Sequence, residues 1–84
     1  MTDIEFELID NLYFVQSFEA LCKTMGMNEY EMKQQLLSLV QKDWVKVMDK
    51  QTDEEISNIE IWTAACDNYF YLATKKGLFE HNTL

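Results

Sequence analysis

Few residues in this chain have the types and spacing needed for covalent or metal chemistry. The single histidine, His81, stands near the C-terminal end, and no serine, cysteine or carboxylate accompanies it in the pattern of a catalytic triad. We therefore expect His81 to be a surface residue. Cys22 and Cys66 do not combine with it at zinc-site spacing. Small disulfide-stabilised folds usually carry more cysteines, so we expect free thiols, with a disulfide as the alternative.

Carboxylates cluster at Asp53, Glu54 and Glu55, where they could contact a divalent cation. A calcium-binding loop, however, needs alternating ligands and a glycine that permits its turn. Gly26 and Gly77 are the only glycines, so the chain also lacks a glycine-rich phosphate loop. We expect a solvated loop at this cluster, and no metal, no cofactor and no catalytic activity.

The strongest candidate for a binding site is a group of three aromatic residues, Trp62, Tyr69 and Tyr71. Alternation with the period of a strand places all three on the face turned away from the strand core. Tyrosine and tryptophan are favoured anchors of protein interfaces, because they bury a large area at little cost in rotamer freedom. The alternatives are that helices cover this face, or that the rings stack on single-stranded bases.

Charge restricts the class of partner. The formal net charge is −8 at pH 7, the pI is near 4.4, and the chain contains no arginine. Residues 1–20 and 52–68 each hold five acidic residues and no cation. Because a DNA duplex is a polyanion that is bound largely through lysine and arginine, this balance disfavours DNA. It favours basic or neutral protein partners.

The length and the N-terminal composition indicate one intracellular domain. The acidic segment 1–10 is unlike the basic start of a signal peptide. No apolar run approaches the roughly 18–20 residues that a bilayer-spanning helix needs. We expect a single domain, 1–84, that works in the cytoplasm without membrane contact.

Capping residues divide most of the chain into helices. Asn28 and Glu31 suit a capping box, and Met27 and Met32 suit a hydrophobic staple around the same helix start. Gly26 suits the left-handed residue that ends the preceding helix. Further caps are expected at Thr2, Ser17 and Thr74. The predicted helices are 3–12, 18–25, 28–42 and 75–81.

Apolar spacing assigns the faces that turn inward. Ile4, Leu8 and Leu12 recur at helical spacing. Val45 and Val47 alternate with polar residues, which predicts a strand over 44–50 with these valines inside. Further inward-facing residues are expected on the two later strands, 58–65 and 69–74.

The last two predicted strands, 58–65 and 69–74, are expected to form a hairpin. Asp67-Asn68 between them suits a two-residue turn. In this register Phe70 faces the core, together with Leu72 on the same strand.

The order of elements, a helix, a stub strand at 13–15, two helices around a tight turn and then strands, resembles the winged-helix superfamily. Residues 69–77, YFYLATKKG, are similar to the Tyr-x-Leu-Thr-x-Lys-Gly strand-to-helix junction of bacterial winged-helix regulators, with one extra residue between Leu72 and Thr74. The resemblance implies an α+β winged-helix domain. Its parts would be a three-helix core with a helix-turn-helix, a β-hairpin or three-stranded wing, and a short C-terminal helix.

Winged-helix regulators bind DNA through the second helix of the motif and through basic wing residues. The resemblance places that helix at 28–42 and the wing tip at 52–55, where acidic residues would repel phosphate. The residues able to contact nucleic acid would be Lys33, Gln34, Gln35, Ser38, Lys46 and Lys50.

Two functions follow from these observations. The first is a small acidic winged-helix module without catalytic activity, which binds a protein partner or a second copy of itself through Trp62, Tyr69 and Tyr71. The alternative is a DNA-binding transcriptional regulator that uses the helix at 28–42 and the wing.

Overall fold

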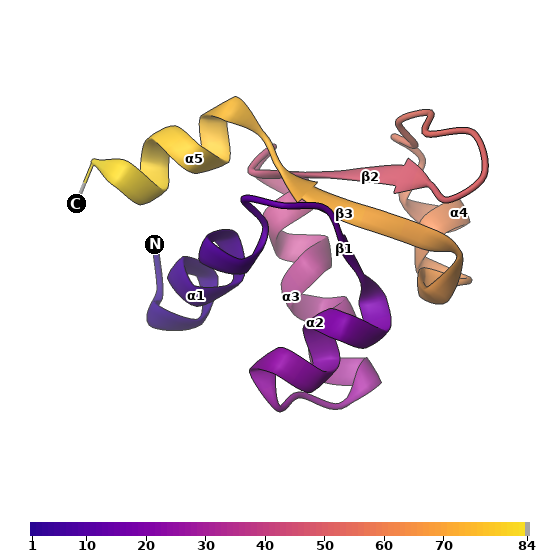
Figure 1. Cartoon of the computed structure of the whole chain (residues 1–84), viewed down its shortest axis with the longest axis horizontal. Coiled ribbons are helices and arrows are strands. Elements are labelled where there is room, and N and C mark those ends of the chain that lie inside the picture. The colour runs from indigo at the N-terminus through magenta and orange to yellow at the C-terminus, as the bar shows by residue number, and fades with distance from the viewer. Residues whose placement is uncertain (84) are drawn as a thin grey trace.

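The computed structural model describes residues 1–83 and shows an α+β fold in which three helices precede most of the sheet (Figure 1). The short strand β1 interrupts these helices, and a second helical segment interrupts the other two strands. In chain order the elements are α1 (Asp3–Asn11), β1 (Gln16–Ser17), α2 (Phe18–Met25), α3 (Glu29–Gln41), β2 (Val45–Asp49), α4 (Ile59–Thr63), the 3₁₀ helix η1 (Cys66–Asn68), β3 (Tyr69–Ala73) and α5 (Lys75–Asn82).

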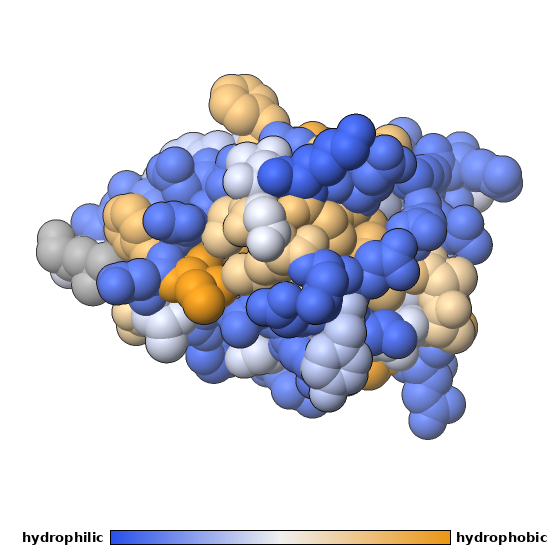
Figure 2. All heavy atoms as spheres, turned by 90° about the horizontal axis from the view of Figure 1, so that it is seen from below, coloured by the Kyte–Doolittle hydropathy of each residue, from blue (hydrophilic) through white to orange (hydrophobic). Residues whose placement is uncertain are grey.

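The three strands form one antiparallel sheet in the order β1-β3-β2. Tyr71 on the central strand lies opposite Val47 on one side and Gln16 on the other. Figure 1 shows α1, α2 and α3 on the same side of this sheet, while α5 continues from the end of β3. Seen from below, hydrophilic residues surround a band of hydrophobic residues on the helical side (Figure 2).

Most of the predicted helix ends are confirmed. Thr2 and Glu5 form a reciprocal capping box at the start of α1. The Asn28 side chain accepts a hydrogen bond of 2.8 Å from the Glu31 backbone N–H at the start of α3. Gly26 adopts the left-handed conformation with φ 64°, as a residue that ends a helix often does. The predicted caps at Ser17 and Thr74 also accept backbone hydrogen bonds.

The core lies between the helices and one face of the sheet. Leu8, Leu12, Val45 and Val47 are buried there, as their spacing predicts. Ile4, by contrast, is 42% exposed, so its predicted place in the core is wrong. None of the helices in residues 1–83 combines the length and the apolar composition that crossing a bilayer requires.

The predicted hairpin is wrong, because residues 59–63 form the helix α4 rather than a strand. The Asn58 side chain caps α4 by accepting hydrogen bonds from the backbone N–H groups of Glu60 and Ile61. Asp67-Asn68 belong to η1 and make no hairpin turn. The partners of β3 are therefore β1 and β2, which are much farther away in the sequence. The Asn58 cap and the packing of Trp62 against Tyr71 together favour the helix over a strand in this segment.

The faces of β3 are also the reverse of the prediction. Tyr69, Tyr71 and Ala73 are buried, whereas Phe70 and Leu72 lie half-buried on the opposite face. Since side chains on a strand alternate, an error in the pairing reverses every residue at once.

The predicted stub strand is displaced as well. Tyr13, Phe14 and Val15 are exposed, and the strand consists of the next two residues, Gln16–Ser17.

Candidate functional site

The three aromatic residues predicted to bind a partner are in the core. Trp62 and Tyr71 are 0% exposed, and Tyr69 is 8% exposed. The rings of Trp62 and Tyr71 meet edge to face, with their centroids 5.9 Å apart. The Tyr71 hydroxyl donates a hydrogen bond of 2.9 Å to the Cys66 carbonyl, which satisfies its buried polar atom. The prediction of an exposed aromatic surface is therefore wrong, because α4 turns Trp62 toward the sheet.

The residues predicted to contact nucleic acid do not form one surface. On α3, Gln34 is exposed, while Lys33, Gln35 and Ser38 are half-buried. The two lysines of the predicted wing, Lys46 and Lys50, lie elsewhere.

Lys46 is on β2 opposite Leu72, on the sheet face that points away from the buried Val45 and Val47. The ammonium of Lys50 lies 5.4 Å from the centre of the Phe70 ring, on the same outer side. Because α3 packs against the inner side of the sheet, Lys33 does not share a surface with these two lysines.

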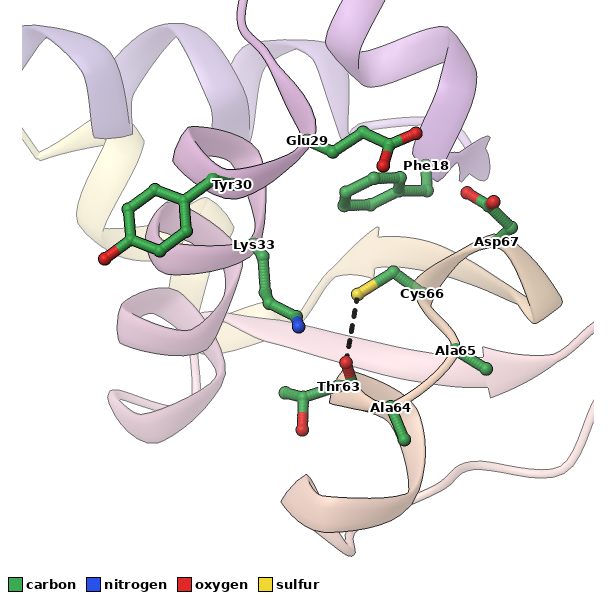
Figure 3. Close-up of a pocket in the computed structure, with 9 residues that line it drawn as sticks. All are labelled: Phe18, Glu29, Tyr30, Lys33, Thr63, Ala64, Ala65, Cys66 and Asp67. Atoms are coloured by element: carbon green, nitrogen blue, oxygen red, sulfur yellow. Dashed lines mark hydrogen bonds between the residues drawn. The ribbon is translucent and has the colours of Figure 1, made fainter.

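A cleft of about 340 Å³ opens between the N-terminal half of α3 and the segment formed by α4 and η1 (Figure 3). Two acidic side chains, Glu29 and Asp67, and one basic side chain, Lys33, lie around the cleft together with apolar and small side chains. The residues that line the cleft are Phe18, Glu29, Tyr30, Lys33, Thr63, Ala64, Ala65, Cys66 and Asp67.

Local sequence signals build both walls of this cleft. Asn28 starts α3, and Glu29 and Lys33 then fall four residues apart on the same flank of the helix. Asn58 starts α4, which ends at Thr63 and packs against α3. Ala64 and Ala65 follow, and their small side chains leave the space in front of α3 open.

The charged groups of the cleft have no partners within the described part of the chain. Within residues 1–83, ion pairs join Lys23 to Glu19 and Lys42 to Glu5, and the His81 ring lies 3.5 Å from the Asp10 carboxylate; none of these residues lines the cleft. Figure 3 shows the carboxylates of Glu29 and Asp67 pointing toward one another beside Phe18, while the Lys33 ammonium reaches toward Thr63 and Cys66. The cleft is therefore divided into an acidic end and a basic end.

The thiol of Cys66 lies between these ends. Burial raises the pKa of this thiol, and the nearby Tyr71 and Lys33 only partly oppose the effect. Its sulfur lies 3.9 Å from the Thr63 carbonyl oxygen, to which the thiol can donate weakly. Since the thiolate is the nucleophilic form, Cys66 is a poor nucleophile at neutral pH.

The second cysteine reports on the same electrostatic neighbourhood. Burial raises the pKa of the Cys22 thiol, and Glu29, Asp67 and Cys66 raise it further. Cys22 and Cys66 are both free, as predicted.

His81 is not the surface residue that the sequence suggested, since it is only 9% exposed. Its ring stacks on Phe6, with the centroids 4.0 Å apart, and its Nδ1 lies 3.1 Å from the Tyr13 hydroxyl. Its Nε2 lies 3.5 Å from the Asp10 carboxylate. The reason is that α5 folds back against α1, a long-range contact with no local signature. His81 takes no part in the cleft.

Within residues 1–83, no three histidine, cysteine or carboxylate side chains converge as a metal site would require. No model of a known protein family matches this sequence, and no significant match to it is found among curated proteins or solved structures.

The sequence indicates only part of the cleft. Lys33 is among the positions expected to contact DNA, and helical spacing places Glu29, four residues earlier, on the same flank. Thr63 and Asp67 were placed on a hairpin that does not form. Asn58, read as a helix cap, was the one local signal that could have placed them.

Proposed function

We propose that this chain is a winged-helix domain that serves as a protein-interaction module without catalytic activity. The order α1, β1, α2, α3, β2, β3 and the sheet order β1-β3-β2 support the assignment, since the third strand pairs between the first two. In this assignment α3 is the second helix of the helix-turn-helix. The segment with α4 and η1 takes the place of the wing between β2 and β3.

One observation carries the functional part of the proposal: α4 packs beside α3, and a cleft remains between them. In a DNA-binding winged helix, this helix must enter the major groove with its flank free. Here Lys33 is the one cation within α3, and it points into the cleft rather than outward. The exposed first turn presents Glu29 and Glu31 instead.

The loop at the wing tip opposes contact with phosphate for the same electrostatic reason. Asp53, Glu54 and Glu55 are all exposed there. A phosphate backbone near them would meet like charge, and affinity for DNA depends strongly on neutralising phosphates.

Features of the cleft support a protein as the partner. Tyr30 stands on its rim with 73% of its surface exposed, and tyrosine is enriched among residues that dominate binding energy. The opposed charges around the cleft can orient a partner and exclude wrong ones. Burial raises the pKa of the Cys66 thiol in the cleft, so the thiolate form that a cysteine nucleophile needs is disfavoured.

Site-specific photo-crosslinking in cells tests this proposal. A photoreactive phenylalanine analogue replaces Tyr30 at the cleft in one variant and Phe79 on α5 in the other. Both residues are exposed aromatics, at 73% and 67%, so they are matched in accessibility. We expect a discrete protein adduct from position 30 and none of the same mass from position 79. Identical adducts from both positions would contradict a partner at the cleft.

Fluorescence anisotropy with a random DNA duplex provides the opposing measurement. We expect no binding even at low salt. Salt-sensitive binding in the micromolar range would instead favour the transcriptional regulator, since nonspecific DNA affinity arises from phosphate contacts.

A further inference from the structure

We propose that the cleft seats an arginine side chain from a basic segment of a protein partner, with its guanidinium between Glu29 and Asp67. This inference rests on the proposed function as a protein-interaction module and names the chemistry that the partner must present. Four features of the cleft lead to it.

The first feature is a pair of like charges that face each other. Glu29 starts α3 and Asp67 lies in η1, and their carboxylates point toward one another in Figure 3. Both residues are exposed, and neither forms an ion pair within residues 1–83. Two carboxylates that face the same cleft both attract a cation, which can therefore interact with both of them at once. This end of the cleft is therefore built to receive positive charge.

The second feature is the aromatic wall beside these carboxylates. The Phe18 ring lies next to both of them in Figure 3, and it lines the cleft although only 3% of its surface is exposed. A guanidinium is planar and weakly hydrated, so it can lie at an apolar wall of this kind while its N–H groups donate to two carboxylates. A lysine ammonium is more strongly hydrated and lacks the planar fork, so it uses this arrangement less well.

The third feature is Lys33 at the other end. Its ammonium reaches into the cleft toward Thr63 and Cys66, and it has no carboxylate partner among residues 1–83. A cationic side chain cannot lie along the whole cleft without meeting this charge. Its cation is therefore directed to the acidic end, and Lys33 can donate to a carbonyl or carboxylate oxygen of the same segment. A bare divalent cation would gain no such second contact.

The fourth feature is size. At about 340 Å³, the cleft lies near the lower end of the range of about 300–1,000 Å³ that is usual for ligand pockets. Ala64 and Ala65 keep one wall low, so a long, narrow side chain can enter while its main chain stays outside. A whole helix or a folded loop would not fit. The net charge of −8 also attracts a basic segment toward the molecule before contact.

Binding of defined peptides to the intact protein tests this proposal. The probe is a short fluorescein-labelled peptide with one arginine among glycines and serines, and its control carries citrulline, which has the same shape but no charge. We expect the arginine peptide to bind and to shift the backbone amide signals of residues 29–33 and 63–67 in NMR spectra. The citrulline peptide should bind at least about tenfold more weakly, because it loses its charge-assisted hydrogen bonds.

Matched variants separate the cleft from the overall charge. The double variant Glu29→Gln, Asp67→Asn removes two charges at the cleft, and Asp53→Asn, Glu54→Gln removes two from the exposed loop. We expect the first to raise the dissociation constant of the arginine peptide about tenfold and the second about twofold or less. Lys33→Gln should weaken binding of the arginine peptide without restoring binding of the citrulline peptide.

Several outcomes would overturn the proposal. These are equal binding of the two peptides, equal losses in the two double variants, or amide shifts outside the cleft. Binding of free arginine as tightly as the peptide would identify a small metabolite rather than a protein segment as the occupant. If a protein crosslinks at position 30 and the double variant Glu29→Gln, Asp67→Asn does not reduce this crosslinking, the arginine inference is refuted, while the proposal of an interaction module is retained. If no protein crosslinks at position 30 and the protein binds DNA tightly, the proposal of a protein-interaction module is itself refuted.

Discussion

The two ends of α3 use the same kinds of side chain in opposite ways. At the C-terminal end, Lys42 forms an ion pair and a hydrogen bond with the buried Glu5 of α1. At the N-terminal end, Lys33 and Glu29 face a cleft and have no ion-pair partner among residues 1–83. Charges that are satisfied inside the molecule support the fold. Charges that are held in place but left unsatisfied are available to a partner.

Burial follows the same division. We call the region around Lys42 and Glu5, at the C-terminal end of α3, the closed end. There the side chains of His81 and Glu5 are 9% and 5% exposed, and each has a polar partner. We call the region around the cleft, at the N-terminal end of α3, the open end. There Glu29 and Asp67 are exposed, although Phe18 and Cys66, which line the same cleft, belong to the core. The contrast shows how one helix can help to stabilise a small domain at one end and present exposed charges at a cleft at the other.

The largest expected effect concerns the core residue behind the cleft. Trp62→Ala should lower the free energy of unfolding by about 3–5 kcal/mol, because it leaves a large cavity under α4. Trp62→Phe should cost clearly less, since it keeps a ring and removes an indole N–H that has no hydrogen-bond partner within residues 1–83. Urea unfolding followed by circular dichroism measures both. A stable Trp62→Ala variant that lost only association would restore the view of Trp62 as an interface residue.

The next effect tests how α5 is held near the closed end. Gly77→Ala should destabilise the protein by about 1–3 kcal/mol, although alanine favours helices, because its Cβ would overlap the Trp44 carbonyl group. Gly26→Ala serves as the control for a backbone effect, since Gly26 has φ +64° and open space around it. Its cost should be about 1 kcal/mol, from the left-handed conformation alone. Melting curves of the two variants compare them, and equal stability of Gly77→Ala and wild type would refute the close contact.

A smaller effect compares Lys33 within α3 with Lys42 at the C-cap of the same helix. Lys42→Gln should cost about 1 kcal/mol at neutral pH, because it leaves the buried Glu5 carboxylate without its cation. Lys33→Gln should change stability by less than about 0.5 kcal/mol, because Lys33 has no carboxylate partner within residues 1–83. Chemical unfolding of both variants alongside wild type provides the measurement. Equal losses would remove the contrast between the two ends.

The cost of Lys42→Gln should also depend on pH. Burial raises the pKa of Glu5, but the hydrogen bonds from Lys42 and Thr2 and the charge of Lys42 outweigh burial and hold the pKa below its usual value. A carboxyl with a lowered folded-state pKa stabilises the protein above its unfolded-state pKa of about 4.3, and the contribution disappears as pH falls through the folded-state value. The difference between wild type and Lys42→Gln should therefore shrink on acidification below about pH 4. A constant difference would contradict the ion pair as its source.

The smallest expected change in stability is at the open end. The double variant Glu29→Gln, Asp67→Asn should leave the melting temperature within a few degrees of wild type, since exposed charges without partners contribute little to folding. A slight increase is consistent with relief of repulsion between the two carboxylates. A strong loss of stability would mean that these carboxylates support the fold, and it would break the contrast with the closed end.

Much of the fold was predictable from residues close together in the chain. Asn28, Gly26, Ser17 and Thr74 define helix ends through hydrogen bonds or conformations that involve neighbours only a few positions away. The valines of β2 were assigned correctly because one face of that strand is buried and the alternation is clear. Local physics was sufficient for these elements.

Residues 58–71 were not predictable in the same way. Asn58 and the isoleucines after it are compatible with a strand or a short helix, and a helix of this length is not stable by itself. The choice depends on packing of Trp62 against Tyr71, which comes from the central strand. Once α4 formed, β3 paired with β2, and its two faces were the reverse of those in a local hairpin.

The sequence by itself determined the acidic charge, the helix caps, the turn at Gly26 and the absence of a recognisable catalytic pattern, because composition and contacts between near neighbours decide these properties. Only the tertiary structure decided that Trp62, Tyr69 and Tyr71 are core residues, that His81 is enclosed against α1, and that the exposed charges of α3 and η1 share a cleft. Those outcomes depend on which distant segments pack together, and the free energy of such packing is a property of the whole fold.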